Sequence, residues 1–288
     1  AIAGLNKAPF ANMGIMKNHG VESTVELNNR INKFQYKLYG NFTFTRNKII
    51  EMDEPEREWE NRMRTGHRYG QQFGLVSLGL FKDQEEIDNS PEQKFGEVRP
   101  GDVKYKDVND DGFIDINDET AIGYSNIPEI VYGFGAQFMW NGFDFGFFFR
   151  GQSNVSYGLG GSTFIPFDQG VGKGNLFKEA LDRWTVENPN PDAFYPRLSN
   201  GRSTNNWQSS TRNIYSGNLL RLNDIELGYT LPKKDISFLG LEGLRIYFLA
   251  NNVAVFSDWK MWDPETGSSN GNRYPLPRKI NFGIRTTF

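Results

Sequence analysis

The sequence predicts an all-β protein, and more specifically a transmembrane antiparallel β-barrel with long extracellular loops. Three observations support this fold class: segments in which apolar and polar residues alternate, a composition rich in strand and turn formers, and connections that alternate between short and long. Alternation with a period of two residues is typical of a strand with one apolar face. The 288 residues include 24 Phe, 12 Tyr and 6 Trp, which favour strands, and 31 Gly and 13 Pro, which favour turns.

Seven segments show this alternation. The clearest covers residues 34–45, where the apolar side chains of Phe34, Tyr36 and Leu38 share one parity. Gln35 and Lys37 occupy the other parity. The remaining predicted strands cover residues 21–28, 130–140, 143–152, 224–230, 244–251 and 279–288.

The connections predict how these strands are arranged. Residues 29–33, 141–142 and 231–243 are short links, whereas residues 47–129, 153–216 and 253–278 are long. Short turns at one rim and long loops at the other are the layout of an outer-membrane barrel. We therefore expect residues 1–19 to end an extracellular loop and residues 20–288 to form a barrel segment. Because bacterial barrels have an even number of strands, this chain is expected to be the C-terminal part of a longer protein.

Composition excludes several other classes of protein. With 32 Lys and Arg against 35 Asp and Glu, the net charge is −3, which gives no reason to expect a nucleic-acid partner. The absence of Cys excludes thiolate chemistry, and the two His residues lie in separate regions without a catalytic motif. We therefore expect no enzymatic activity. A soluble β-sandwich or lipocalin-like barrel stays open as an alternative fold, because its strands also alternate.

A series of motifs, spread over nearly the whole chain, resembles the C-terminal third of SusC/RagA-family TonB-dependent transporters of Bacteroidetes outer membranes. Each motif alone is weak, and their order is what carries the resemblance. Along the chain they are Met16 to Glu22 (MKNHGVE), Phe42 to Lys48 (FTFTRNK), Gly79-Leu80-Phe81, Pro100 to Gly123 (PGDVKYKDVNDDGFIDINDETAIG), Tyr132-Gly133-Phe134, Trp140 to Asp144 (WNGFD), Arg183-Trp184-Thr185, Leu220 to Pro232 (LRLNDIELGYTLP), Asn251-Asn252, Asp263-Pro264-Glu265, Tyr274 to Arg278 (YPLPR) and the terminal Phe288.

The resemblance implies an architecture and a set of partners. The chain would supply the last seven strands of a barrel of about 22 strands. Its partners would be the N-terminal barrel and plug segment, a SusD-like surface lipoprotein, TonB acting through the missing N-terminal part, and outer-membrane lipid. The cargo would be oligosaccharides or oligopeptides. Two alternatives remain open: a passive porin or siderophore-type receptor, and a surface glycan-binding or adhesion module without transport.

One segment of the longest loop has the spacing of a calcium-binding loop. Ca²⁺ prefers six to eight hard oxygen ligands, and an EF-hand-type loop supplies them from positions 1, 3, 5, 7 and 12 around a Gly at position 6. The Gly here is Gly112, and an Asx-rich surface turn is the plainer alternative. The predicted ligands of a structural, extracellular Ca²⁺ are Asp107, Asn109, Asp111, the carbonyl of Phe113, Asp115 and Asp118.

Aromatic residues in the loops are candidates for contact with substrate, because aromatic rings stack on sugars and anchor interfaces. Residues 175–187 show helical spacing of their apolar side chains, which predicts a short helix that packs in a surface loop. Packing is therefore the preferred interpretation of Trp184. The candidate substrate-binding residues are Trp184, Trp207, Tyr195, Tyr157 and Trp59.

Overall fold

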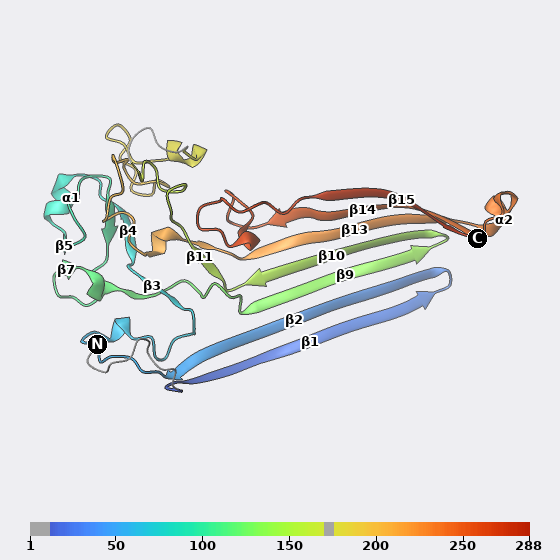
Figure 1. Cartoon of the computed structure of the whole chain (residues 1–288), viewed down its shortest axis with the longest axis horizontal. Helices are drawn as coiled ribbons and strands as arrows, with labels where there is room; N and C mark the ends of the chain where they lie inside the picture. The colour runs from blue at the N-terminus through green and yellow to red at the C-terminus, as the bar shows by residue number, and fades with distance from the viewer. Residues whose placement is uncertain (1–11, 170–175) are drawn as a thin grey trace, which may run out of the picture.

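A computed structural model describes residues 12–169 and 176–288, and its main feature is one antiparallel sheet of seven long strands (Figure 1). The strand order is β1-β2-β9-β10-β13-β14-β15. The seven long strands therefore lie side by side in the order in which they follow one another along the chain. The strands are β1 (Ile15–Ile31), β2 (Phe34–Glu51), β9 (Ile130–Trp140), β10 (Phe143–Ser153), β13 (Leu219–Leu231), β14 (Gly243–Phe256) and β15 (Lys279–Thr287). The all-β prediction is confirmed.

The register of the sheet separates the side chains onto two faces, as the alternation predicts. Residues that pair across strands point to the same face. On the apolar face, Phe138 stacks on Phe145 with ring centroids 6.4 Å apart, and Phe134 stacks on Phe149 at 5.1 Å. This face is not covered by other parts of the described chain: Phe282 at the end of the sheet remains 81% exposed.

The other face is polar. Arg245 of β14 donates to Asp144 of β10 and, at 2.6 Å, to Glu226 of β13. Tyrosine rings on this face lie over glycines of the neighbouring strand, where a Cβ atom would clash. The ring of Tyr39 leaves only 2.7 Å for a Cβ on Gly135. The glycines thus let bulky side chains lie flat against the backbone.

Four of the seven strands extend well beyond the predicted limits. β1 begins at Ile15, and β2 continues to Glu51. β13 begins at Leu219 rather than near residue 224, because a β-bulge at Asn223 changes the parity of the side chains. Leu222 and Ile225 therefore share a face although they are three residues apart, which breaks the period-two pattern.

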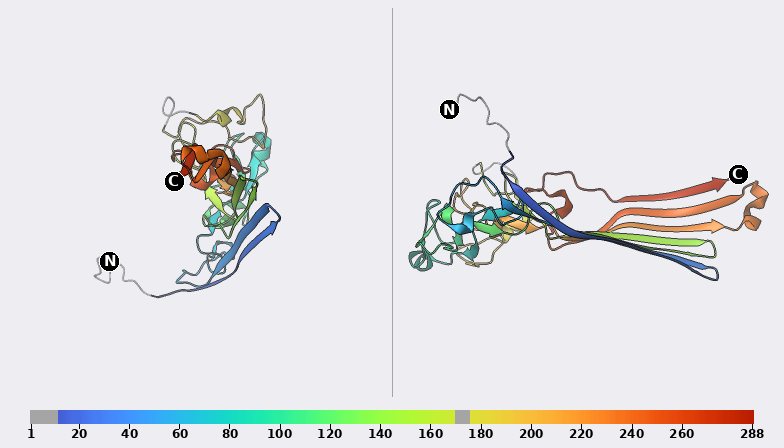
Figure 2. Two further views of the ribbon diagram at one scale, coloured as in Figure 1. Left: turned by 90° about the vertical axis from the view of Figure 1, so that its right-hand side faces the viewer. Right: turned by 90° about the horizontal axis from the view of Figure 1, so that it is seen from below.

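A second irregularity beside Asn252 lies in the paired part of β14, and the sheet bends in this region (Figure 2).

The long loops fold into a cluster at the end of the sheet opposite the C-terminus (Figure 1). This cluster contains four two-stranded sheets, β3-β8, β4-β6, β5-β7 and β11-β12, within the described residues. Their strands are β3 (Gln72–Gly74), β4 (Ser77–Leu80), β5 (Glu92–Gln93), β6 (Val103–Tyr105), β7 (Phe113–Ile114), β8 (Thr120–Ile122), β11 (Ser156–Gly158) and β12 (Ile214–Ser216).

Helices are short throughout. Among the described residues none is long and apolar enough to cross a membrane. The helices are α1 (Gln84–Asp88), α2 (Lys233–Ile236), and the 3-10 turns η1 (Glu60–Arg62), η2 (Ile116–Asp118), η3 (Lys178–Leu181), η4 (Thr211–Asn213), η5 (Ser237–Leu239) and η6 (Pro264–Thr266).

The short helix predicted over residues 175–187 forms only in part, and residue 175 itself lies outside the described residues. Only η3 forms there, and Leu181 is 81% exposed. The chain then leaves the helical path because the backbone N–H of Trp184 donates to the carbonyl of Tyr195, 3.1 Å away. A tertiary backbone contact thus replaces the helical hydrogen bond that the spacing predicted.

Candidate functional site

The loop cluster is built around two buried hydrophobic cores. The first contains Leu75, Leu80, Val103, Tyr105, Ile114, Trp184 and Ala193. The second contains Phe164, Ala180 and Tyr195, with further aromatic side chains packed around them. Both cores join loop segments that are far apart in the sequence, so the three long loops form one folded unit rather than independent arms.

A cleft of about 200 Å³ opens beside the second core. Its walls include Phe194, Tyr195, Trp207 and Arg212. The guanidinium of Arg212 donates to the backbone carbonyls of Ala193 and Phe194 but makes no ion pair with any residue that the structure describes. Burial lowers the pKa of Arg212. The cleft therefore combines aromatic walls with the charged side chains of Arg212 and Asp192, a lining that suits a flat ring carrying polar groups.

The structure separates the predicted substrate-binding residues into different environments. Tyr195 and Trp207 come together at the cleft, although Tyr195 is only 1% exposed. Trp184 is 7% exposed in the first core, which agrees with the packing interpretation. Tyr157 lines a second, glycine-rich groove of about 600 Å³. Trp59 lies before η1, is half-buried and lines neither of these two sites.

A buried polar network joins the first and second loops. Asp102 is fully buried and accepts from Arg197 and from the amide of Asn206, the latter at 2.7 Å. Next to it, the side-chain amide of Gln93 donates to Asn205 at 2.7 Å. Sequence reasoning missed this network, because its members lie about a hundred positions apart and only Asp102, in the segment from Pro100 to Gly123, belongs to a recognised motif.

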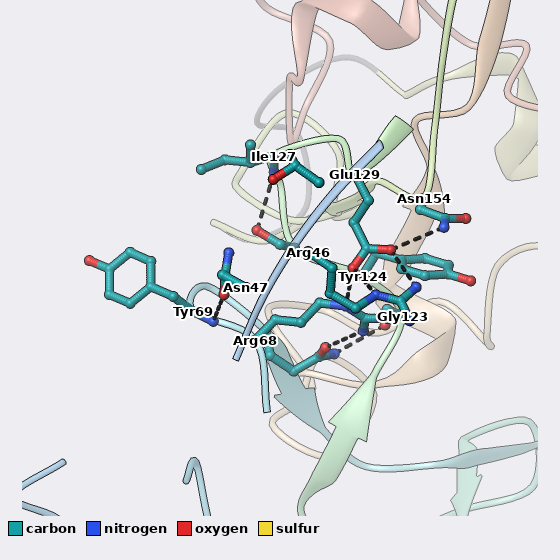
Figure 3. A network of polar contacts seen from close by, with 12 residues as sticks. Arg46, Asn47, Arg68, Tyr69, Gly123, Tyr124, Ile127, Glu129 and Asn154 are labelled. Carbon is teal, nitrogen blue, oxygen red and sulfur yellow. Dashed lines mark hydrogen bonds and ion pairs between the residues drawn. The ribbon is translucent and has the colours of Figure 1, made fainter. Parts of the chain in front are cut away.

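Glu129 joins the two ends of the first long loop (Figure 3). Arg46 donates to its carboxylate at 2.9 and 2.8 Å, Arg68 donates to the same group, and Asn154 donates at 3.1 Å. Although burial favours the neutral acid, the hydrogen bonds from Arg46 and Asn154 and the charge of Arg68 lower the pKa of Glu129. This carboxylate therefore holds β2, the loop and the start of β9 together.

Arg221 holds the third long loop in the same way. Its side chain is fully buried on β13, and it donates to both carboxylate oxygens of Asp263 at 2.7 Å and to Glu265 at 2.9 Å. Glu265 also accepts from Arg150, and Arg221 donates to Asn252 beside the irregularity in β14. The motifs around Arg221 and Asp263 were recognised in the sequence, but their pairing was not.

The predicted calcium segment forms a tight turn with its acidic side chains partly occupied by the backbone. Asp118 is fully buried, accepts from the backbone N–H of Val108 at 2.7 Å and of Asp115 at 2.8 Å, and has its pKa raised by burial. Asp107 accepts from Gly112 with one oxygen, while its buried Oδ1 has no hydrogen-bond partner.

The outer members of this segment pair with one another. The amide of Asn109 donates to Asp111 at 2.9 Å, and Asp111 accepts from the backbone N–H of Phe113. Within the described residues, no three acidic or histidine side chains are gathered closely enough to hold a metal ion. The donor set consists of hard oxygens, which suits Ca²⁺, but its carboxylates are dispersed in this structure.

The two-faced sheet and the loop cluster at one rim define the class of this protein, which is a segment of an outer-membrane β-barrel. The chain is 30% identical over 302 residues to TonB-dependent receptor P26 of Formosa agariphila, an alignment that covers 96% of this chain and 30% of that protein. It is 24% identical to TonB-dependent receptor P3 of the same organism, covering 96% of this chain and 29% of that protein. The recognition made from its motifs is confirmed, since nearly the whole chain is homologous to part of proteins named TonB-dependent receptors.

Solved structures share the fold of this chain. The RagAB peptide importer in its open-open state matches with a TM-score of 0.71 at 22% identity, covering 96% of this chain and 29% of that one. Its closed-closed state matches with a TM-score of 0.73 at 22% identity, covering 100% of this chain and 31% of that one. No family model matches the chain. The chain spans about 30% of the length of these relatives, and their family is not one of enzymes, as expected from the motifs.

Proposed function

We propose that this chain is part of a TonB-dependent importer of the Gram-negative, Bacteroidetes-type outer membrane that takes up oligosaccharides or oligopeptides. The observation that carries the proposal is the similarity to TonB-dependent receptors along 96% of the chain. The sheet supports it, because a barrel wall with a polar inner face and an apolar outer face suits a transporter.

The loop cluster is where the cargo would first bind. The cleft beside Tyr195 and Trp207 has aromatic walls and the Arg212 guanidinium, a combination that fits a sugar ring or a peptide side chain. The solved relatives of this fold are described as peptide importers, which favours peptides over glycans. The partners in this proposal are the N-terminal barrel and plug segment, TonB and a SusD-like surface lipoprotein, and the assembly of the RagAB importer supports the last of these.

Uptake by the full-length protein tests this function. Cells that express it should accumulate labelled oligopeptide or oligosaccharide in the periplasm only when TonB is present and the inner membrane is energised. Uptake that persists without TonB would instead favour a passive porin. Cargo that binds to the cell surface without entering would favour an adhesion or glycan-binding module.

The cleft itself is tested by Trp207→Ala in the full-length protein. Removing one aromatic wall should weaken cargo binding about fivefold to tenfold, measured as the Kd on detergent-solubilised protein. Tyr69→Ala is the matched control, because Tyr69 is an aromatic residue of the first loop that is 64% exposed and lies outside the cleft. Equal weakening by both changes would contradict a role for the cleft.

We also propose that Ca²⁺ binds to the segment from Asp107 to Asp118 and has a structural role. The unpartnered buried Oδ1 of Asp107 supports this, since a buried carboxylate oxygen without a partner is costly and a cation would satisfy it. Gly112, with a φ of +86°, supplies the sharp turn that such a loop needs. Binding would draw the dispersed carboxylates of Asp111 and Asp115 toward Asp107 and Asp118.

Metal content and proteolysis test the calcium proposal. Wild-type protein dialysed against millimolar Ca²⁺ should retain the ion, and Asp107→Asn with Asp111→Asn should lose it. Chelation should make residues 107–118 of the wild type more susceptible to protease. Asp110→Asn is the control, because Asp110 is not among the proposed ligands. Wild type that holds no calcium, or a double variant that is equally protected, would leave the segment as a turn only.

A further inference from the structure

The apolar face of β2 has a length that matches the hydrocarbon layer. Its apolar side chains run from Phe34 to Phe44, which is ten residue steps or roughly 33 Å at about 3.3 Å per residue. A strand tilted by about 40° therefore spans roughly 25 Å along the membrane normal, the height of the apolar band of an outer-membrane barrel. The pair Val21–Phe44 is thus the last apolar pair before the outer rim.

Beyond this pair, the same face becomes cationic. Antiparallel pairing places His19 opposite Arg46 and Lys17 opposite Lys48, and these four residues continue the parity of Val21 and Phe44. Two contacts with the ring of Phe44 confirm the shared face: His19 meets it edge-on at 6.3 Å, and the Arg46 guanidinium lies over it at 5.4 Å. Lys48 lies roughly 13 Å along the strand beyond Phe44.

The first loop adds further positive charge at this position. The backbone N–H of Ile49 donates to the carbonyl of His67, so the segment around Arg64 and Arg68 lies beside the end of β2. Burial, together with the charges of Arg64, Arg68 and Lys48, lowers the pKa of His67. We call Lys17, His19, Arg46, Lys48 and Arg68 the outer basic patch.

Carboxylates only partly compensate the outer basic patch. Glu129 is shared between Arg46 and Arg68, and Glu54 is occupied by Arg57 and by backbone N–H groups. Lys17 and Lys48 are exposed and form no ion pair with any residue in the described part of the chain. The patch therefore carries an excess of positive charge at the level where a membrane presents its headgroups.

Strands β10, β13 and β14 do not share this feature. On the same face and at the same rim, β10 ends in Ser153, β13 begins near Leu220 and β14 ends in Phe256. The outer end of β15 is also basic, with the exposed Arg278 directly before Lys279. The positive charge is therefore concentrated at the β1–β2 hairpin, where Lys17, Arg46 and Lys48 share one face.

We propose that the outer basic patch binds the phosphate groups of a glycolipid in the outer leaflet. Phosphate is the anionic group that a leaflet presents at this depth, and lysine and arginine side chains bind it by charge-assisted hydrogen bonds. Phe44 and Val21, directly below the patch, contact the acyl chains of the same lipid. This inference depends on the outer-membrane barrel and is independent of the cargo.

Lipid binding to the full-length protein in detergent micelles tests the proposal, with lipid A as the phosphate-bearing probe and native mass spectrometry as the readout. Lys17→Ala with Lys48→Ala should weaken lipid A binding about tenfold. Lys279→Ala is the matched control, because Lys279 lies at the same rim on the polar face and should leave binding unchanged. Retention of the heat-dependent shift of folded barrels on gels shows that the variants are folded.

Three results would overturn the proposal. They are equal lipid A binding by wild type and the double variant, equal binding of dephosphorylated lipid A by wild type, and full displacement of lipid A by millimolar inorganic phosphate. The last result would indicate a site for soluble anions. Loss of cargo uptake in wild type would contradict the proposed function and leave the lipid site intact, so the two failures are distinguishable.

Discussion

The sheet and the loop cluster use the same kinds of residue in opposite ways. Every residue of β1 is exposed, and apolar side chains such as Val25 and Phe282 are 67% and 81% exposed. In the loop cluster, Val103 and Val155 are fully buried, and so are the charged side chains of Asp102 and Arg221, the latter at the junction with the sheet. The sheet has its apolar residues on the outside, whereas the cluster has an interior.

This difference indicates which solvent stabilises each region. Backbone ladders satisfy the polar groups within the sheet, and its apolar face gains stability only when lipid covers it. The loop cluster is surrounded by water and buries its apolar side chains in its own interior. Its buried charged groups have hydrogen-bond or ion-pair partners. A substitution should therefore act according to the region in which it lies, and the following changes test that rule from the largest expected effect to the smallest.

Arg221→Ala should have the largest effect, because it leaves the carboxylate of Asp263 without its cationic partner and leaves Glu265 paired with Arg150 alone. Breaking a buried ion pair from one side typically costs about 3 to 5 kcal/mol. Limited proteolysis should show cleavage in residues 257–278, and the thermal unfolding temperature in detergent should fall. Arg202→Ala is the control, since its side chain is 51% exposed and lies 3.9 Å from Asp168. Similar losses for both variants would contradict the role assigned to burial.

Leu38→Lys should cost about 2 to 4 kcal/mol, the range for a lysine at the midplane on the lipid side of a barrel. Leu38 lies near the middle of β2 on the apolar face and is 41% exposed in the chain alone. Asn41→Lys, in the same strand on the polar face, should cost much less. Equilibrium unfolding of the full-length protein in lipid vesicles measures both, and the reverse order would mean that the faces are wrongly assigned.

Glu54→Gln should destabilise the first loop by roughly 1.5 to 3 kcal/mol, as expected for lost hydrogen bonds to a charged group. Burial would raise the pKa of Glu54, but hydrogen bonds from the backbone of Thr65 and Arg64, the Thr65 hydroxyl and Arg57 lower it to about 2. Because the pKa is lower in the folded state, the stabilisation is present above the usual value of 4.5 and is lost as the pH falls toward 2.

Hydrogen exchange of residues 57–68 at decreasing pH measures this effect. Wild type should lose protection of this segment below about pH 4, and Glu54→Gln should lack that part of the pH dependence. Unchanged protection down to pH 2 in the wild type would contradict the coupling.

Lys233→Ala should have the smallest effect, at most about 1 kcal/mol, because its ion pair with Glu242 is exposed on both sides. The two side chains are 68% and 61% exposed at 3.2 Å, at the short-turn rim. Salt should remove what remains of the difference in unfolding free energy. A loss as large as that of Arg221→Ala would show that this turn is more than a surface link.

The sequence predicts the sheet well because period-two patterning is local. Residues 130–140 were predicted as a strand and form β9 with the same limits. The pattern fails where the backbone changes its phase: the bulge at Asn223 hides the first part of β13, and the charged residues beyond Phe44 hide the last part of β2. Both parts of the strands were missed for the same reason. Alternation can be recognised in the sequence only where one face of the strand stays apolar at every second residue.

The loop cluster was much less predictable, because its contacts connect distant positions. Gln93 and Asn205 are 112 positions apart, and Arg46 and Glu129 are 83 apart. No single-sequence pattern encodes such pairs. Local features were visible, such as the Asx-rich turn around Gly112. The aromatic residues were recognised as candidates, but only the fold separates Tyr195 and Trp207 at the cleft from Trp184 in the core.

The bulge at Asn223 also has a consequence for how this protein can vary. In a regular strand, side chains alternate between the two faces without interruption. Inserting or deleting one residue therefore moves every following side chain to the opposite face. At Asn223 the bulge interrupts this alternation. Arg221, on the side of the bulge toward the loops, and Asp224, on the side toward the short turns, therefore face the same side although they are three residues apart. A length change above the bulge would therefore move Arg221 away from its ion pairs with Asp263 and Glu265, whereas the membrane-facing part below the bulge would keep its register.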